Sequence, residues 1–123
     1  MISNVLLGSN DLKKAEVFYD ELLVIFDAKQ TMNTEKAILW KSEDGSVGIA
    51  VCKPHDGLVA TSGNGSMVGL KADSKEMAIA VYENAISLGE SCGGAPGERR
   101  TGVFAAYFRD LDKNKFGIFY VSS

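Results

Sequence analysis

The segment AAYFRDLDKNKFGIFYV, residues 105–121, has the most distinctive pattern in the chain. Both of its ends are apolar and rich in aromatic and β-branched side chains, which favour strands. The polar run RDLDKNK between them contains aspartates and an asparagine, which favour a turn. The pattern therefore predicts a hairpin whose strands cover residues 103–109 and 115–121.

Two segments upstream have the spacing of amphipathic helices. In NDLKKAEVFYDELL, residues 10–23, Asn10 is the expected N-cap, and apolar side chains recur every three or four positions. They are Leu12, Ala15, Phe18, Tyr19, Leu22 and Leu23. The second helix is predicted within DSKEMAIAVYENAISLG, residues 73–89, where Asp73 and Glu76 form a capping-box-like pair and Gly89 ends the helix.

The two helices belong to an architectural repeat. Each follows a short apolar strand, SNVLLG at residues 3–8 or SMVGLKA at residues 66–72, and precedes several strand-like runs. The expected N-caps, at positions 10 and 73, are separated by 63 residues, as are Asn4 and Met67. The later strands are expected at residues 25–29, 37–41 and 48–52, and at residues 90–92, 103–109 and 115–121.

The chain is therefore expected to be an α+β domain written as β-α-β-β-β twice. Module one covers about residues 1–53, a Gly- and Pro-containing linker covers about 54–65, and module two covers about 66–123. Residues 92–102 form a second Gly-rich segment and are expected to be a loop. A length of 123 residues with 46% hydrophobic content is enough for one ordinary core.

The composition also excludes several classes of function. The net charge of -3 comes from interspersed charges, which argues against nucleic acid as a partner. The absence of a signal-peptide pattern and of an apolar stretch near the ~20 residues of a membrane span predicts a cytoplasmic protein without a membrane partner. Cys52 and Cys92 show no CxxC spacing and are expected to be reduced thiols.

Four segments together resemble the glyoxalase, bleomycin-resistance and dioxygenase proteins, the vicinal oxygen chelate superfamily. They are the helix at residues 10–23, the junction GNGSMVGLKA at 63–72, the stretch GGAPGERR at 93–100 and the hairpin at 105–121. The resemblance implies two βαβββ modules that form an open, curved β-barrel around a central cavity. A homodimer is expected, because cavities in this architecture commonly involve one and pairing would cover free sheet edges.

Metal-dependent members of that superfamily hold a divalent ion through the first strand of each module and the last strand of the second. By motif these ligand positions fall on Asn4, Met67 and Gly117. None of them offers the carboxylate or imidazole that such an ion requires, and the only histidine, His55, lies in the linker. We therefore expect no metal and no cofactor.

Several side chains remain candidates for a ligand site, each with a structural alternative. Tyr107 is expected to face the cavity, where it could orient a ligand or act as a general acid, while Phe108 packs against a helix. Met67 could be an adaptable cavity wall or core filling, and Asn4 could hydrogen-bond a ligand or nearby backbone groups. Trp40 could form the floor of a pocket or lie in the core.

Charged residues give further candidates. Arg99 and Arg100 could bind an anionic ligand, or could simply be solvated. His55 could gate the cavity, or could be an exposed turn residue. Asp110 and Asp112 have the alternate spacing of a calcium loop without its glycine and distal glutamate, so we interpret them as structural.

These patterns support two functional hypotheses. The first is a metal-independent protein that binds a small organic molecule in the cavity between the modules. The second is a glyoxalase-like lyase or isomerase that uses Tyr107 and loop residues such as His55 or Arg100 without the usual metal.

Overall fold

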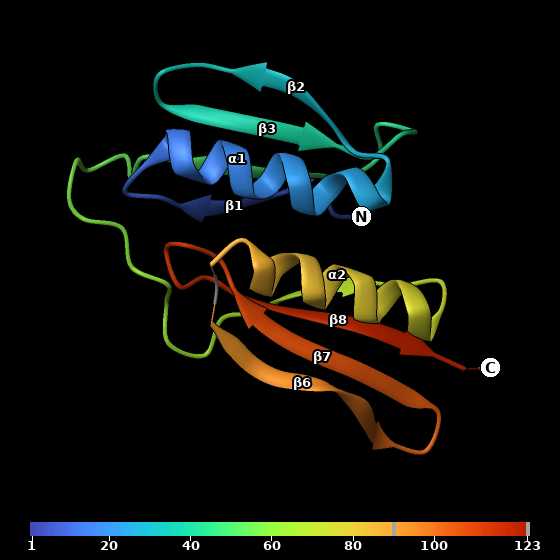
Figure 1. Cartoon of the computed structure of the whole chain (residues 1–123). Coiled ribbons are helices and arrows are strands. Elements are labelled where there is room, and N and C mark those ends of the chain that lie inside the picture. The colour runs from blue at the N-terminus through green and yellow to red at the C-terminus, as the bar shows by residue number, and fades with distance from the viewer. Residues whose placement is uncertain (90, 123) are drawn as a thin grey trace. The chain divides into compact units, whose positions relative to one another are not determined.

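The structure, a computed structural model, describes residues 1–89 and 91–122. These residues form two compact units that divide between Ser62 and Gly63, inside the predicted linker (Figure 1). Each unit has the element order β-α-β-β-β and a four-stranded mixed sheet, so the predicted α+β class and its repeat are confirmed. None of the described helices is long and apolar enough to cross a membrane.

The first unit has strand order β1-β4-β3-β2, in which β1 runs parallel to its neighbour β4 and the other pairs are antiparallel. Its elements are β1 (Asn4–Gly8), α1 (Leu12–Leu23), β2 (Lys29–Asn33), β3 (Ala37–Lys41) and β4 (Gly48–Cys52). The second unit has the equivalent order β5-β8-β7-β6. Its elements are β5 (Val68–Lys71), α2 (Lys75–Ser87), β6 (Cys92–Arg100), β7 (Val103–Arg109) and β8 (Lys115–Val121).

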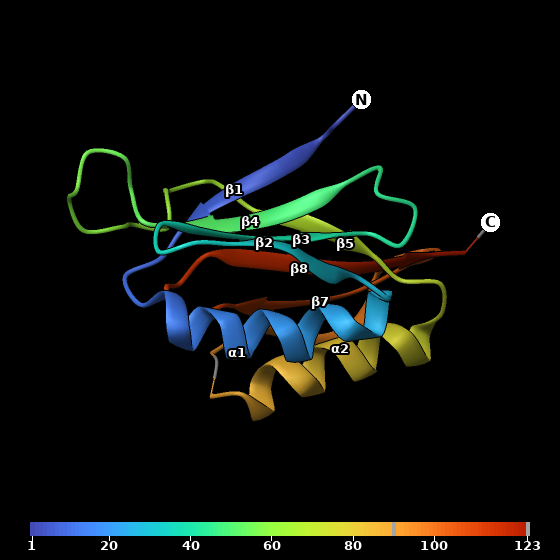
Figure 2. The same ribbon diagram turned by 90° about the horizontal axis from the view of Figure 1, so that it is seen from above.

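In each unit one helix covers one face of the sheet. Figure 2 shows α1 along one side of the β1–β4 sheet. All six apolar residues predicted for the buried stripe of α1 are buried in the structure. Trp40 on β3 lies in the same core: its indole N–H donates to Asp20 Oδ1 at 2.8 Å, and its ring centroid is 5.4 Å from that of Tyr19.

Both predicted helix starts are wrong by one residue. The α1 N-cap is Asp11, whose carboxylate accepts from the backbone N–H of Lys14 at 3.1 Å, while Asn10 bonds both backbone groups of Ala60. The α2 N-cap is Ser74, whose hydroxyl accepts from the N–H of Met77 at 3.0 Å. The two caps are still 63 residues apart, so the register of the repeat holds.

The strand predicted at residues 25–29 is also wrong. Its apolar start instead extends α1 as a single 3-10 turn, Val24–Phe26, which Asp27 ends in the left-handed conformation at φ 57°. β2 begins only at Lys29 and forms a bulged antiparallel pair with β3. An apolar run of this length does not distinguish a strand from a helix end.

The largest correction concerns β6. Residues 92–102 were expected to be a loop and residues 90–92 a strand; the structure has a strand from Cys92 to Arg100, and residue 90 lies outside the described residues. β6 pairs with β7 through three register shifts. One shift spans Gly94 to Gly97 and contains Pro96, which cannot donate to the ladder and is tolerated at such an irregularity on an edge strand.

The β7–β8 hairpin is held by a buried aspartate. Asp110 is 1% exposed, and its carboxylate accepts from the backbone N–H groups of Asp112 and Asn114 and from the side-chain amide of Asn114, at 2.8–2.9 Å. Lys113 in the same turn has φ 71°, in the left-handed region. The interpretation of this segment as a structural turn agrees with these bonds.

We predict that Asp110→Ala lowers the free energy of unfolding by about 3 kcal/mol, because it leaves several buried N–H donors without an acceptor. Chemical denaturation followed by circular dichroism measures the change. Glu43→Ala, which removes an exposed carboxylate, should change it by less than about 0.5 kcal/mol. Equal effects of the two substitutions would contradict this role for Asp110.

Candidate functional site

The face of the second sheet opposite α2, here called the open face, contains a cross-strand row with little side-chain volume. Gly69 on β5 pairs with Gly117 on β8, Gly117 pairs with Tyr107 on β7, and Tyr107 pairs with Gly94 on β6. Tyr107 is thus the only residue of this row with a side chain. Directly paired residues point to the same face, so the three glycines leave room beside the tyrosine ring.

The ring of Phe119 fills part of that room. Phe119 is two residues after Gly117 on β8 and therefore points to the same face. A Cβ at Gly117 would lie 2.6 Å from Cε2 of Phe119 and 3.1 Å from Cε1 of Tyr107, and a Cβ at Gly69 would lie 3.3 Å from Phe119 Cε2. The Phe119 ring thus lies over both glycines, and its edge-to-face contact with Tyr107 has a centroid separation of 5.7 Å.

Two cations lie over the Tyr107 ring. Arg99 Cζ on β6 and Lys115 Nζ on β8 are each 5.4 Å from the ring centroid. The adjacent residue, Phe108, is fully buried on the α2 side and stacks on Phe116 with ring centroids 5.4 Å apart. The predicted alternation of these two aromatic residues is therefore confirmed, and Tyr107 lies on the open face.

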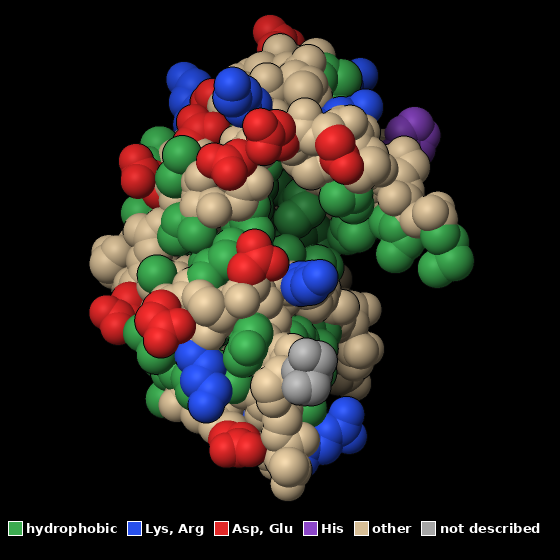
Figure 3. Space-filling view, turned by 90° about the vertical axis from the view of Figure 1, so that its right-hand side faces the viewer, with side chains coloured by type: hydrophobic (Ala, Val, Ile, Leu, Met, Phe, Trp, Pro, Cys, Tyr) green, Lys and Arg blue, Asp and Glu red, His purple; other side chains and the backbone are tan. Residues whose placement is uncertain are grey.

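The other candidate residues lie elsewhere in their units. Trp40 is 1% exposed in the core of the first unit, which agrees with the core interpretation. His55 is exposed in a turn after β4, and Figure 3 shows the histidine side chain, in purple, at the surface. Arg100 is exposed at the end of β6, so it is Arg99 that the structure brings to Tyr107.

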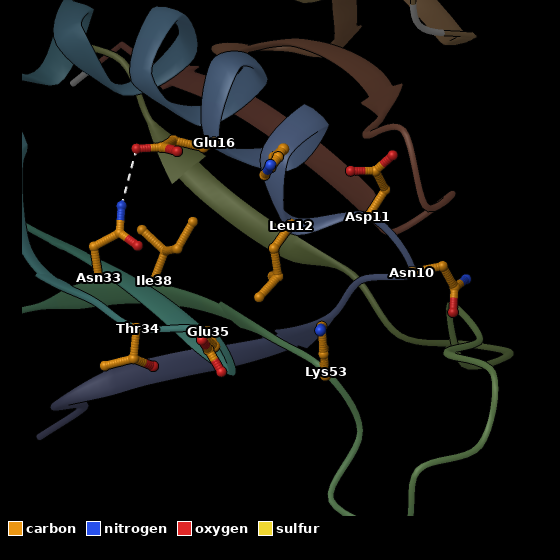
Figure 4. Close-up of a pocket in the computed structure, with 10 residues that line it drawn as sticks. Asn10, Asp11, Leu12, Glu16, Asn33, Thr34, Glu35, Ile38 and Lys53 are labelled. Atoms are coloured by element: carbon orange, nitrogen blue, oxygen red, sulfur yellow. Dashed lines mark hydrogen bonds between the residues drawn. The ribbon is translucent and has the colours of Figure 1, made fainter.

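A groove of about 740 Å³ opens in the first unit between the start of α1 and the β2–β3 hairpin (Figure 4). Its polar groups are largely occupied by structural bonds. Glu16 accepts from the amides of Gln30 and Asn33, and the Thr34 hydroxyl accepts from the N–H groups of Lys36 and Ala37. These groups bond to neighbouring protein atoms instead of converging on an open centre, so we do not choose this groove as the functional site.

Both cysteines are free thiols. The Tyr82 hydroxyl donates to Cys92 Sγ at 2.9 Å, and this bond raises the pKa of Tyr82 above its ordinary value. Burial raises the pKa of the Cys52 thiol. A raised thiol pKa disfavours the thiolate, so Cys52 is not activated as a nucleophile.

No family model and no curated protein matches the chain. Solved structures do match it over nearly its full length. A glyoxalase/bleomycin resistance protein from Albidiferax ferrireducens is 31% identical, with 99% of each chain covered and a TM-score of 0.90. The chain belongs to the glyoxalase/bleomycin resistance protein family.

Two more distant structures have the same fold as this family member. A glyoxalase/bleomycin resistance protein/dioxygenase family enzyme from Burkholderia phytofirmans is 21% identical, covers 98% of both chains and has a TM-score of 0.79. The fosfomycin resistance protein FosX from Listeria monocytogenes is also 21% identical, covers 99% of this chain and 93% of its own, and has a TM-score of 0.74.

The three positions matched to metal ligands do not provide a donor set in this family member. Asn4 is the first residue of β1, and Met67, 45% exposed, lies one residue before β5. Gly117 has no side chain, and the place of a Cβ there is taken by Phe119. Within the described residues, no group of three or more His, Cys, Asp or Glu side chains is arranged to hold an ion. These residues do not fit the divalent metal of the superfamily.

Phe119 and Lys115 were not among the residues singled out from the sequence. The spacing Gly117-x-Phe119 within a predicted strand could have indicated Phe119, because two residues so spaced share one face. Lys115 and Tyr107 belong to neighbouring cross-strand pairs, and their proximity depends on the hairpin register. The strand bounds were predicted, but they do not by themselves specify which residues pair across the turn.

We predict that Gly117→Ala destabilises the protein by about 1–3 kcal/mol, because its methyl group must displace the Phe119 ring. Gly69→Ala, the matched substitution at the paired position, should cost less, since its methyl group approaches the same ring only to 3.3 Å. Thermal or chemical unfolding measures both changes.

A double-mutant cycle with Phe119→Leu tests whether the Phe119 ring causes the destabilisation by Gly117→Ala. The cost of Gly117→Ala should fall by about 1 kcal/mol or more in the Phe119→Leu background. An unchanged cost in that background would show that the ring is not responsible.

Proposed function

We propose that this protein is a metal-independent small-molecule-binding member of its family, with the ligand held at the open face of the second sheet. The observation that carries this proposal is the replacement of the last-strand ligand position by Gly117, whose side-chain space is filled by Phe119 beside Tyr107. An aromatic pair replaces a metal donor at this position. Aromatic side chains with a few polar groups are the usual lining of small-molecule sites.

The structure supports a contact surface with three kinds of group. Phe119 and the Tyr107 ring provide apolar contact area, and the Tyr107 hydroxyl can donate or accept a hydrogen bond. Gly69, Gly117 and Gly94 add no side chains of their own; the Phe119 ring lies over the first two, and the Arg99 guanidinium lies beside the third. A groove of about 540 Å³ in the second unit, lined in part by Gly69, Lys71 and Phe119, adjoins this surface.

The test is a fragment screen by nuclear magnetic resonance with and without a chelator. We expect bound fragments to shift the backbone resonances of Tyr107, Gly117 and Phe119, with the same affinity after EDTA treatment. Tyr107→Leu should weaken binding at least about tenfold, or about 1.4 kcal/mol, because it removes the central ring of the site. Tyr82→Leu is the matched control, since Tyr82 lies on α2, which covers the other face of the sheet, and its hydroxyl bonds to Cys92.

Three outcomes are informative. A stoichiometric divalent metal, found by elemental analysis and required for binding, would overturn the proposal. So would fragment binding that shifts resonances only outside the open face. Chemical conversion of a bound fragment in the same spectra, abolished by Tyr107→Phe and unaffected by EDTA, would replace the binding function with the glyoxalase-like enzyme expected as the alternative.

The single-domain organisation, the homodimer and the cytoplasmic location expected from the sequence stay predictions. Each sheet has two edge strands, β1 and β2 in the first unit and β5 and β6 in the second, whose outer backbone groups favour pairing with another strand. We expect light scattering at micromolar concentration to give about twice the mass of the 123-residue chain. A monomer mass under those conditions would contradict the dimer.

A further inference from the structure

The strands of the second sheet carry an excess of positive charge, although the chain as a whole has a net charge of -3. β5, β6, β7 and β8 contain one carboxylate, Glu98. Glu98 pairs with Phe104, which lies under Lys75 of α2 and therefore points to the helix side. The same strands contain the five cations Lys71, Arg99, Arg100, Arg109 and Lys115.

Four of these cations belong to the open face. Arg99 and Lys115 lie over the Tyr107 ring. Lys71 pairs with Phe119 and lines the same groove, and Arg109 pairs with Lys115. No strand residue of this face is an aspartate or glutamate within the part of the chain that the structure describes. The charge of this face is therefore of one sign.

No carboxylate within residues 1–89 and 91–122 neutralises the two cations nearest Tyr107. Arg99 Nη2 donates to the carbonyl oxygen of Ala95 at 2.6 Å, which holds the guanidinium in place and leaves its charge uncompensated. Neither Arg99 nor Lys115 has an ion pair within residues 1–89 and 91–122. Both cations therefore place uncompensated positive charge beside the Tyr107 ring, where a bound anion would be favoured.

We propose that the ligand of the open face is a small organic anion, with a carboxylate or phosphoryl group bound by the cations beside Tyr107, Arg99 and Lys115, and an apolar or planar part against Tyr107 and Phe119. This inference rests on the binding function proposed above and assigns its ligand class. Charge-assisted hydrogen bonds from guanidinium and ammonium groups suit both kinds of oxyanion. The rings of Tyr107 and Phe119 provide the apolar contact area for the rest of the molecule.

The test compares three probes of nearly equal shape and different charge: benzoate, neutral benzamide and cationic benzamidine. Binding is followed through the resonances of Tyr107, Gly117 and Phe119. We expect benzoate to bind at least about tenfold more tightly than benzamide and benzamidine to bind more weakly than benzamide. The benzoate affinity should fall as salt is raised, while the benzamide affinity should not. Phenylphosphonate, tested in parallel, should bind at least as tightly as benzoate.

The double variant Arg99→Gln/Lys115→Gln should reduce the benzoate affinity to that of benzamide and leave benzamide binding within about twofold. The matched control is Lys13→Gln/Lys36→Gln, which removes two exposed lysines of the first unit. Both double variants change the net charge from -3 to -5, so a difference between them reports position and not total charge.

The possible results distinguish a failure of the anionic-ligand proposal from a failure of the binding function itself. Equal binding of the three probes at the open face, lost in Tyr107→Leu, would overturn the anionic ligand and leave the binding function intact. Equal weakening of benzoate by the two double variants would also overturn it. If neither these probes nor the fragments bind the open face, both proposals fail.

Discussion

The ring of Phe119 lies over the paired glycines Gly69 and Gly117, and the form of the open face depends on that contact. A β-carbon at residue 117 would approach the ring to 2.6 Å, well inside van der Waals contact. Residue 117 must therefore be glycine as long as the ring holds this position. An aromatic ring that covers a cross-strand glycine also compensates for the side-chain packing that the glycine lacks.

This contact has a chemical consequence. In metal-dependent relatives the last strand is expected to contribute a carboxylate, and here Phe119 excludes one by occupying its space. The edge-to-face contact of Phe119 with Tyr107 contributes about 0.5–1.5 kcal/mol beyond its buried area, so the arrangement is favourable in itself. Positive charge at this face comes from arginine and lysine side chains of the strands. The three matched positions offer no donor set through which a resident ion could polarise a ligand.

The sequence was most informative where local pattern and tertiary packing agree. The bounds of β3, β4, β7 and β8 follow from short apolar runs between clear turns, and the α1 stripe follows from helical spacing. Each cap was placed one residue early, because Asn10 and Asp11, or Asp73 and Ser74, are adjacent residues with similar capping ability. For the site, alternation placed Tyr107 opposite Phe108, and the family resemblance placed Gly117. The role of Phe119 and the positions of the cations required the strand register.

The sequence-based prediction of a loop was wrong at β6, which contains Gly94 and Arg99 of the proposed site. Glycines and a proline indicate a loop when the sequence of this segment is considered alone. In the structure β7 is its partner strand, and the residues that fit the ladder poorly lie at the register shifts. The bond from Arg99 to Ala95 closes across one of these irregularities, so the guanidinium is held by its own strand over Tyr107. Lys115 lies on a regular strand, where the register with β7 determines its position. A ligand that meets Arg99 therefore encounters a pre-positioned donor, whereas Lys115 contributes charge on a flexible side chain.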